Sequence, residues 1–496
     1  MTRRIILAAL TGAFTAGLIG GGESVAPSPQ QPAGTHPNVV VFMVDDANVE
    51  DIAYMPQVQA RLVAQGVTFA KNYSPNALCC PARVSTFTGE YSHNTGVVDN
   101  VAPLGGITAF DDSSDIATWL DADYRTALVG KYLNQYGQQP GGNTYIPPGW
   151  DSWMVPPEKV AYHYLGQHLN VDGTMRDFSG IYSTTLYGNL SRAFLESRNP
   201  HPFFLFTSFV APHFGKPHEV DDPGMVSPYV EPKYQNTYTG PTLPTDTSVN
   251  EADISDKRKS FQDTPLLSNE TLAEISEVLA QRREALHSVD DQIAGIMDKV
   301  AAIGEDADTY YIFVSDNGYF QGQHRIPQAK QQPYEADARV PLIIAGPGLP
   351  HGAVVTQVTG LQDIAPTVLA MTNERGSQGS FSIDGESLLP LANGGTSSRA
   401  QLLETAVTDQ VSYNEANQVG AYGSRTTIKW ATRSIVTSHG WKLIRYPRTH
   451  EVELYNLATD PFEEHNLGRD PDYDAIQASL AARLSTLKMC SGAGCR

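Results

Sequence analysis

The feature that most constrains the fold is a set of five short, mostly apolar segments spread over residues 38–346. They read NVVVFMV at 38–44, YRTALVG at 124–130, PFFLFTSFV at 202–210, TYYIFVS at 309–315 and VPLIIAG at 340–346. Near-continuous apolar runs of this length are typical of strands that are buried on both faces. Helix-like segments separate them, at 55–66, 113–122 and 269–304. The alternation predicts an α/β fold with a large, mixed but mostly parallel sheet sandwiched by helices.

The pattern changes beyond about residue 395. Residues 433–467 read as a short antiparallel meander with polar turns, and residues 472–488 follow as a helix. We therefore expect a main domain over 37–395 and a smaller C-terminal α+β domain over 396–496, built on a short antiparallel sheet.

The N-terminus has the composition of an export signal. A short basic region, MTRR, precedes an apolar stretch of signal-peptide length, so we expect a signal peptide over 1–25 and a linker over 26–36. This predicts a secreted or extracytoplasmic protein with no membrane span once it is mature. In that compartment Cys490 and Cys495, joined by flexible Ser and Gly, can form a local disulfide, with free thiols as the alternative.

The formal net charge of −20 limits the classes of partner. It argues against nucleic-acid binding, which depends on clustered Lys and Arg. An anionic substrate would gain nothing from such a global field, so any anion site must be built locally from a metal or a few converging cations.

Polar residues follow directly after four of the expected strands. Asp45 and Asp46 follow the first, Asp316-Asn317 form a second pair, and Lys131 and His213 follow two others. Ligands bind at the carboxyl ends of the strands in open α/β sheets. The oxygen ligands suit Ca²⁺ or Mg²⁺ better than zinc, although such pairs are also common in turns.

The stretch LCCPARVSTFTG at 78–89 holds two of the four cysteines. Pro81 suits the first turn of a helix, which places Cys79 close to a helix N-terminus, where an anion is favoured. Arg83 lies one turn further on and can reach the same region. Cys80 has the simpler interpretation of a small buried side chain.

These motifs, in this order, resemble the type I, formylglycine-dependent sulfatases of the alkaline phosphatase superfamily. The resemblance rests first on C-x-P-x-R followed by T-G. It rests also on four further blocks: GKYLNQYG at 130–137, FVAPHFGKP at 209–217, the segment 315–348 that begins SDNGYF, and the segment 441–467 that runs from WKLIRYP to EEHNL. The doubled cysteine, GKYLNQYG and the C-terminal cysteine pair are most similar to the N-acetylglucosamine-6-sulfatase branch.

The resemblance implies that a separate formylglycine-generating enzyme converts Cys79 into formylglycine, whose hydrate attacks the sulfur of a sulfate monoester. Only Cys79 has proline two positions on and arginine four on, since residue 82 is Ala. The implied ligands of one Ca²⁺, or of Mg²⁺ instead, are Asp45, Asp46, Asp316, Asn317 and the modified residue 79.

The remaining roles are implied in the same way. Arg83 would steady the formylglycine, Lys131 and Lys330 would bind sulfate oxygens, and His213 would protonate the leaving alcohol. The chain departs from the family where Leu133 replaces a histidine that contacts formylglycine; that contact is lost or comes from Asn134. His324 is a candidate substrate contact.

The substrate is expected to be a small-molecule or oligosaccharide sulfate ester, either a sulfated sugar resembling N-acetylglucosamine-6-sulfate or an aryl sulfate. Two long segments, 140–180 and 214–265, are expected to be loops around the pocket, with Tyr162, His163, His168 and His218 as candidate contacts. One alternative is a phosphonate or phosphate monoester hydrolase of the same superfamily. The other is a non-catalytic carbohydrate-binding protein in which Cys79 is unmodified.

Overall fold

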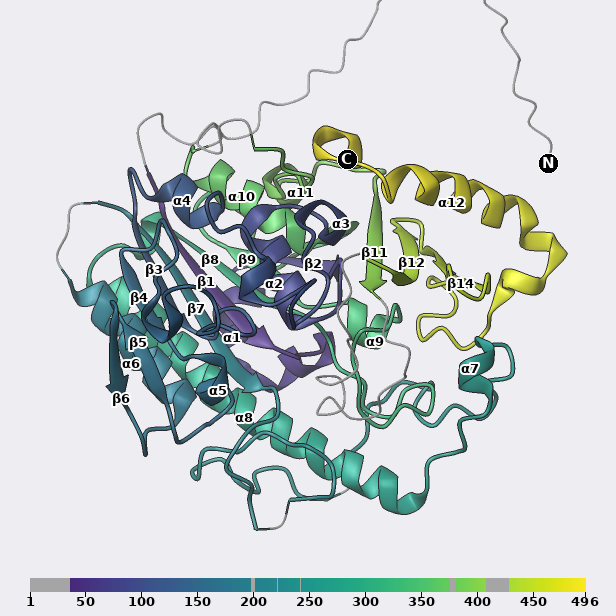
Figure 1. Cartoon of the computed structure of the whole chain (residues 1–496), viewed down its shortest axis with the longest axis horizontal. Coiled ribbons are helices and arrows are strands. Elements are labelled where there is room, and N and C mark those ends of the chain that lie inside the picture. The colour runs from purple at the N-terminus through teal and green to yellow at the C-terminus, as the bar shows by residue number, and fades with distance from the viewer. Residues whose placement is uncertain (1–35, 198–200, 221, 241, 375–380, 407–427) are drawn as a thin grey trace, which may run out of the picture. The chain divides into compact units, whose positions relative to one another are not determined.

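A ten-stranded, mixed sheet forms the centre of the computed structural model, which describes residues 36–197, 201–220, 222–240, 242–374, 381–406 and 428–496 (Figure 1). In spatial order the strands are β10 (Ala353–Gly360), β2 (Gly66–Tyr73), β9 (Leu342–Ala345), β8 (Thr309–Ser315), β1 (Asn38–Asp45), β7 (Phe203–Pro212), β3 (Arg125–Gly130), β4 (Ser152–Val155), β5 (His168–Val171) and β6 (Thr174–Asp177). All five predicted strands are present. The predicted signal peptide and nearly all of the predicted linker lie outside the described residues.

The central strands are parallel, as the buried apolar runs predict. β1 pairs in parallel with β7 on one side and with β8 on the other, with Val39 opposite Phe204 and Val40 opposite Tyr311. β9 is antiparallel to both of its neighbours, so the sheet is mixed. Every residue of β1, β7 and β8 is buried, which explains why these strands lack the alternation of half-buried strands.

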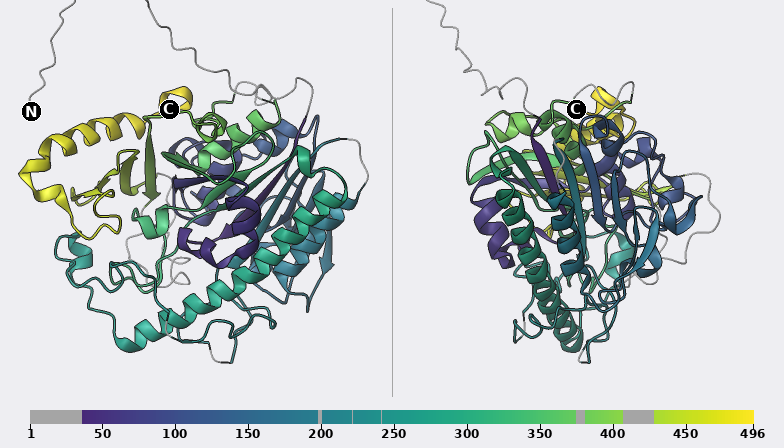
Figure 2. Two further views of the ribbon diagram at one scale, coloured as in Figure 1. Left: turned by 180° about the vertical axis from the view of Figure 1, so that it is seen from behind. Right: turned by 90° about the vertical axis from the view of Figure 1, so that its left-hand side faces the viewer.

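Helices cover both faces of this sheet (Figures 1 and 2). The helices are α1 (Pro56–Val58), α2 (Cys79–Thr88), α3 (Ser92–Thr95), α4 (Ile116–Leu120), α5 (Glu158–Ala161), α6 (Ser183–Glu196), α7 (Lys259–Gln262), α8 (Asn269–Ala302), α9 (Glu335–Ala338), α10 (Ile364–Met371), α11 (Leu389–Ala392) and α12 (Asp474–Leu487). One core cluster packs α2, α4 and α10 against one face, and a second packs α6 and α8 against the other.

The prediction of a loop over 140–180 is wrong. This segment contains β4, β5 and β6, which extend the sheet beyond β3. The strands are only four residues long, and β6 is exposed throughout, so they lack the buried apolar run that marks the central strands.

A second, four-stranded antiparallel sheet lies in the C-terminal part. Its strands are β11 (Ala400–Ala406), β12 (Trp430–Thr437), β13 (Trp441–Arg445) and β14 (Val452–Asn456), and α12 packs against it. The meander and the helix are thus where the sequence predicts them. The domain boundary at 395/396 falls shortly before β11 and stays a prediction.

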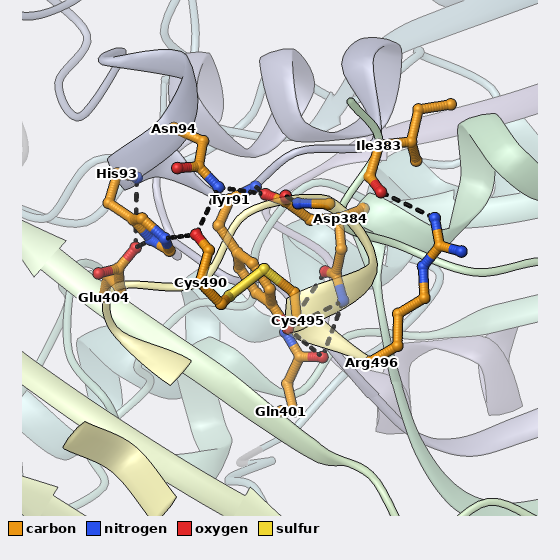
Figure 3. The surroundings of a disulfide bond; sticks show 12 residues. Tyr91, His93, Asn94, Ile383, Asp384, Gln401, Glu404, Cys490, Cys495 and Arg496 are labelled. Carbon is orange, nitrogen blue, oxygen red and sulfur yellow. Dashed lines mark hydrogen bonds and ion pairs between the residues drawn. A yellow bond between two sulfur atoms is a disulfide. The ribbon is translucent and has the colours of Figure 1, made fainter. Parts of the chain in front are cut away.

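The C-terminal cysteines form a disulfide, and the loop that they close is held against α3 (Figure 3). His93 Nε2 and Asn94 Nδ2 lie 2.9 and 3.0 Å from the carbonyl oxygen of Cys490. His93 Nδ1 lies 2.7 Å from a carboxylate oxygen of Glu404 on β11. One histidine therefore links α3, the small sheet and the disulfide loop.

Candidate metal and sulfate site

The site begins with two carboxylates at the carboxyl end of the central strand. Asp45 is the last residue of β1, and Asp46 follows with φ of +67°, a left-handed conformation that is uncommon outside glycine. Such a conformation redirects the chain within one residue, and strain of this kind is concentrated at functional sites. Both side chains are fully buried.

The acidic pair after β8 lies beside them. Asp316 Oδ1 accepts hydrogen bonds from the backbone N–H groups of Asp46 and Asn317, at 3.2 and 2.8 Å. Asn317 Nδ2 donates to Asp46 Oδ1 at 2.5 Å. The parallel pairing of β1 with β8 thus brings together two pairs that are about 270 residues apart in the sequence.

Cys79 is the first residue of α2, so the helix begins two residues before Pro81. Its Sγ lies 3.5 Å from Asp45 Oδ1 and 2.9 Å from Lys330 Nζ. Burial, together with the negative charge of Asp45, raises the pKa of the Cys79 thiol. Cys80 packs into the apolar core instead, and it is not disulfide-bonded.

Arg83 joins the elements of the site from one turn along α2. Its guanidinium donates to Asp316 Oδ2 at 2.8 Å and to Asp45 Oδ2 at 3.3 Å. It also donates to Ser208 Oγ on β7 at 2.7 Å and to the carbonyl of Lys131 at 2.9 Å. A fully buried arginine with these partners fixes the helix against four strands, β1, β3, β7 and β8.

Two lysines and a histidine complete the charge pattern. Lys131 Nζ is paired with Asp45 Oδ2, Lys330 Nζ lies 2.8 Å from Asp46 Oδ1, and His213 Nε2 lies 3.7 Å from Asp46 Oδ2. Burial alone would raise the pKa of Asp45, but the charges of Lys131, His213 and Arg83 together hold it below its ordinary value. Burial and the charge of Asp45 raise the pKa of Asp316.

The donor set fits a hard divalent cation. One donor atom each from Asp45, Asp46, Cys79 and His213 lie within 4.8 Å of one another. Within the described part of the chain, Asp46 Oδ2 and Asn317 Oδ1 are buried and accept no hydrogen bond. Buried oxygens without donors are costly unless a cation or water binds them, and Ca²⁺ and Mg²⁺ bind such oxygens.

Tyr162 is the one candidate from the long segments that contacts this site. Its ring stacks on the imidazole of His213 at 4.6 Å between centroids, and Lys131 Nζ lies 4.8 Å from the ring centroid. Its hydroxyl accepts from Asn134 Nδ2 at 3.0 Å. His168 and His218 are instead largely exposed and lie beside Asp177 and Asp222.

Asn134 and His324 lie in other settings. Asn134 donates to Tyr162 and to Glu158 Oε1, while Leu133 is buried in the core, so neither has a described contact with Cys79. His324 Nδ1 lies 2.6 Å from Glu251 Oε2, and burial lowers the pKa of His324 to about 3. Among the described contacts, His324 has no hydrogen bond or ion pair with Asp45, Asp46 or Asp316. Its role in substrate binding stays a prediction.

The sequence interpretation missed Arg282. This residue lies in the middle of α8 and donates from Nη2 to the carbonyl oxygen of Asp46. The same nitrogen lies 3.6 Å from Asp51 Oδ2. It supports the left-handed turn at Asp46 from the opposite face of the sheet. An arginine within a long amphipathic helix gives no sequence signal of such a role.

Comparison with known proteins identifies relatives over nearly the whole described chain. The model of the sulfatase family matches residues 37–374, and that of the C-terminal region of N-sulphoglucosamine sulphohydrolase matches residues 322–489. Human N-acetylglucosamine-6-sulfatase is 28% identical over 498 residues, which cover 94% of this chain and 87% of the human protein.

Solved structures share the fold, and two of them illustrate it. One, determined in complex with its substrate D-glucosamine-2-N,6-O-disulfate, has a TM-score of 0.68 at 22% identity and covers 91% of this chain and 97% of its own. The other, a phosphonate monoester hydrolase from Silicibacter pomeroyi, has a TM-score of 0.68 at 19% identity and covers 91% and 95%. They confirm the predicted fold class: a large, mostly parallel sheet between helices, with a small antiparallel sheet.

Proposed function

The chain belongs to the sulfatase family, and from that premise we propose that it hydrolyses sulfate monoesters at the site around Cys79, with a sulfated sugar as the preferred substrate class. The observation that carries this proposal is the convergence of Cys79, three buried carboxylates and the two lysines Lys131 and Lys330 at the carboxyl end of one sheet. An aryl sulfate is the second substrate class. Relatives named as N-acetylglucosamine-6-sulfatases support the sugar.

The metal proposed is Ca²⁺, with Mg²⁺ as the alternative, held by Asp45, Asp46, Asp316, Asn317 and the modified residue 79. When bound, such a cation would supply Lewis-acid polarisation of a sulfate oxygen and of the nucleophile. The charges support it, because Arg83 and a divalent cation together balance the three carboxylates. Lys131 and Lys330 could then exchange their carboxylate partners for the sulfate group.

Side chains of the protein would bind the sulfate group and protonate the leaving alcohol. Lys131 and Lys330 flank Cys79 and would bind the sulfate oxygens, where their charge offsets the negative charge that develops in the transition state. His213 Nδ1 lies 2.7 Å from the carbonyl oxygen of Phe214, which fixes the ring so that Nε2 faces the site. From that nitrogen His213 would donate a proton to the leaving alcohol.

We propose that Cys79, converted to formylglycine by a separate modifying enzyme, supplies the nucleophile as the hydrated aldehyde. Arg83 would hold this end of α2 in register with the carboxylates. We also propose that the protein is exported. The support is that relatives in Caenorhabditis elegans and Drosophila melanogaster have names that include extracellular sulfatase. In the described part of the chain no helix is long and apolar enough to cross a membrane.

Mass spectrometry and a substrate panel test the proposal together. The peptide that holds residue 79 should have the mass of the aldehyde, and Cys79→Ala should abolish turnover while Cys80→Ala leaves the modification in place.

The substrate panel comprises N-acetylglucosamine-6-sulfate, an aryl sulfate and a phosphonate monoester. Preferential cleavage of the phosphonate would support the alternative hydrolase, and an unmodified thiol in fully active protein would refute the proposed nucleophile. Sugar binding without turnover would indicate a carbohydrate-binding protein.

A further inference from the structure

The one-turn helix α9 lies between the large sheet and the small sheet (Figures 1 and 2). Its backbone holds the loops that carry the carboxylates. The carbonyl oxygen of Ala336 accepts from Asn48 Nδ2 at 2.8 Å and from the backbone N–H of Tyr319 at 3.1 Å. The carbonyl oxygen of Asp337 accepts from the N–H of Gly318 at 2.7 Å. The loops after β1 and β8 are therefore both fixed to α9.

The same helix holds the segment that carries Lys330. The carboxylate of Asp337 accepts from the backbone N–H of Gln332 at 2.6 Å, two residues after the lysine. Between them Gln331 has φ of +68° and donates its N–H to the carbonyl of Ala77, just before Cys79. A left-handed residue between two anchored neighbours leaves little freedom in the direction of Lys330.

The small sheet holds α9 through one buried ion-pair network. Lys442 Nζ on β13 lies 3.0 Å from Glu335 Oε1 and 2.8 Å from Glu463 Oε1. Glu463 Oε2 accepts from the backbone N–H of Glu335, the first residue of α9, at 2.6 Å. The side chain of Lys442 has no exposed surface. Burial alone would lower the pKa of Lys442, but the two carboxylates raise it, so Lys442 carries its charge. Burial raises the pKa of Glu463 to about 7.

A second contact supports the same helix. The hydroxyl of Tyr334, directly before α9, donates to Glu453 Oε2 on β14 at 2.8 Å. Lys442, Glu453 and Glu463 all fall in the C-terminal motif that begins WKLIRYP. The described contacts of these three side chains include Tyr334 and Glu335, next to and in α9. The part of the structure that this motif holds is therefore α9 and the residue before it.

We propose that Lys442 is a positioning residue for the sulfate site: through Glu335 and Glu463 it holds α9, and α9 holds Lys330 in line with Cys79. The proposal rests on the proposed function, because it assigns Lys330 to the sulfate group. Removing Lys442 leaves the buried carboxylate of Glu463 without its cation, while Glu335 keeps only Arg339, whose Nε lies 3.5 Å from Oε2. The buried charge then has no compensation, so α9 must shift or take up water. A shift of about 1 Å in a binding group can lower kcat/KM by up to about 100-fold.

The test compares Lys442→Met with Arg445→Met on the same strand. Arg445 is exposed and has no described side-chain partner, so it controls for loss of a cation from β13. We expect Lys442→Met to raise KM for the sulfate ester by about tenfold with a smaller fall in kcat, because Lys330 contacts the anion before and during reaction. Arg445→Met should match wild type, and Lys442→Arg should recover part of the loss.

The split between KM and kcat excludes a merely structural role, since partial unfolding lowers the active fraction and leaves KM unchanged. The Kd for inorganic sulfate, measured by calorimetry, should rise in parallel and needs no turnover. It therefore separates failure of positioning from failure of hydrolysis. Should Lys442→Met not fold, Glu335→Gln breaks the same pair at constant size. Unchanged KM and sulfate Kd in the folded variant would overturn the proposal.

Discussion

Replacing Arg83 by methionine should destabilise the metal-free protein more than any surface charge deletion. The guanidinium is fully buried and holds two carboxylates, Asp45 and Asp316, at 3.3 and 2.8 Å. Removing one partner of a buried ion pair costs about 3–5 kcal/mol, because the remaining charge stays buried without compensation. Arg61, which pairs with the largely exposed Asp298, is the matched control, and Arg61→Met should cost about 0–1 kcal/mol.

The loss should depend on pH in a defined direction. The pKa of Asp45 is lowered in the folded state, so its stabilising contribution is present above the unfolded value of about 3.9 and is lost as the pH falls. Without Arg83 that contribution shrinks, and the raised pKa of Asp316 rises further. Asp45 still contributes at pH 4, because its folded pKa is much lower, so the pH dependence comes from Asp316. A further rise in the pKa of Asp316 costs folding free energy at pH 7.5, where that carboxyl is ionised in the unfolded chain, and costs little at pH 4. The difference in unfolding free energy between wild type and Arg83→Met should therefore be larger at pH 7.5 than at pH 4.

Urea unfolding in EDTA, at both pH values, measures these differences for the two variants. Equal losses for Arg83→Met and Arg61→Met would show that the buried pairs contribute no more than a surface pair. A loss for Arg83→Met that is independent of pH would instead indicate a packing defect rather than uncompensated charge.

Three further outcomes are expected. Tyr162→Leu should lower kcat/KM by about tenfold while Tyr162→Phe retains most activity, because the ring alone contacts His213 and Lys131; equal losses would assign the effect to the hydroxyl. Ca²⁺ at about 100 times its Kd should stabilise EDTA-treated protein by about 2.7 kcal/mol in thermal unfolding, and an unchanged midpoint would argue against the metal site. Burial lowers the pKa of His93, but Glu404 outweighs it and the net shift is upward, so the contribution of His93 is present below about pH 6.5 and lost at higher pH. His93→Gln should therefore destabilise more at pH 6 than at pH 9, and equal effects would contradict this.

Much of the fold follows from the sequence because burial leaves a clear pattern. β1, β7 and β8 are buried on both faces, so their composition alone identifies them. β5 and β6 carry no such pattern, because they lie at the sheet edge beyond β4 and pair only with short neighbours. Their pairing depends on tertiary context, which a single sequence does not display.

Some residues of the site could likewise be predicted from the sequence, and others could not. Asp45, Asp46, Asp316 and Asn317 could be found because they follow strands whose ends must meet at one edge. Residues that contact the site from elsewhere in the fold have no recognisable sequence pattern. Arg282 lies within a helix, and Lys442 lies in a different sheet, more than 100 residues beyond Lys330. Their partners are defined only by how distant segments pack.

The position of β1 in the sheet has a consequence for synthesis. Asn38 at its start meets Phe203 on one side and Thr309 on the other, separations of 165 and 271 residues. At about 5–20 residues per second, roughly 10–30 s pass before the first of these partners exists. Throughout that time the nascent chain carries an unpaired strand with an unbroken apolar run from Val39 to Val44, and with Asp45 at its end. The site around Asp45 therefore forms late, and the unpaired β1 is open to wrong pairing until its partner strands are synthesised.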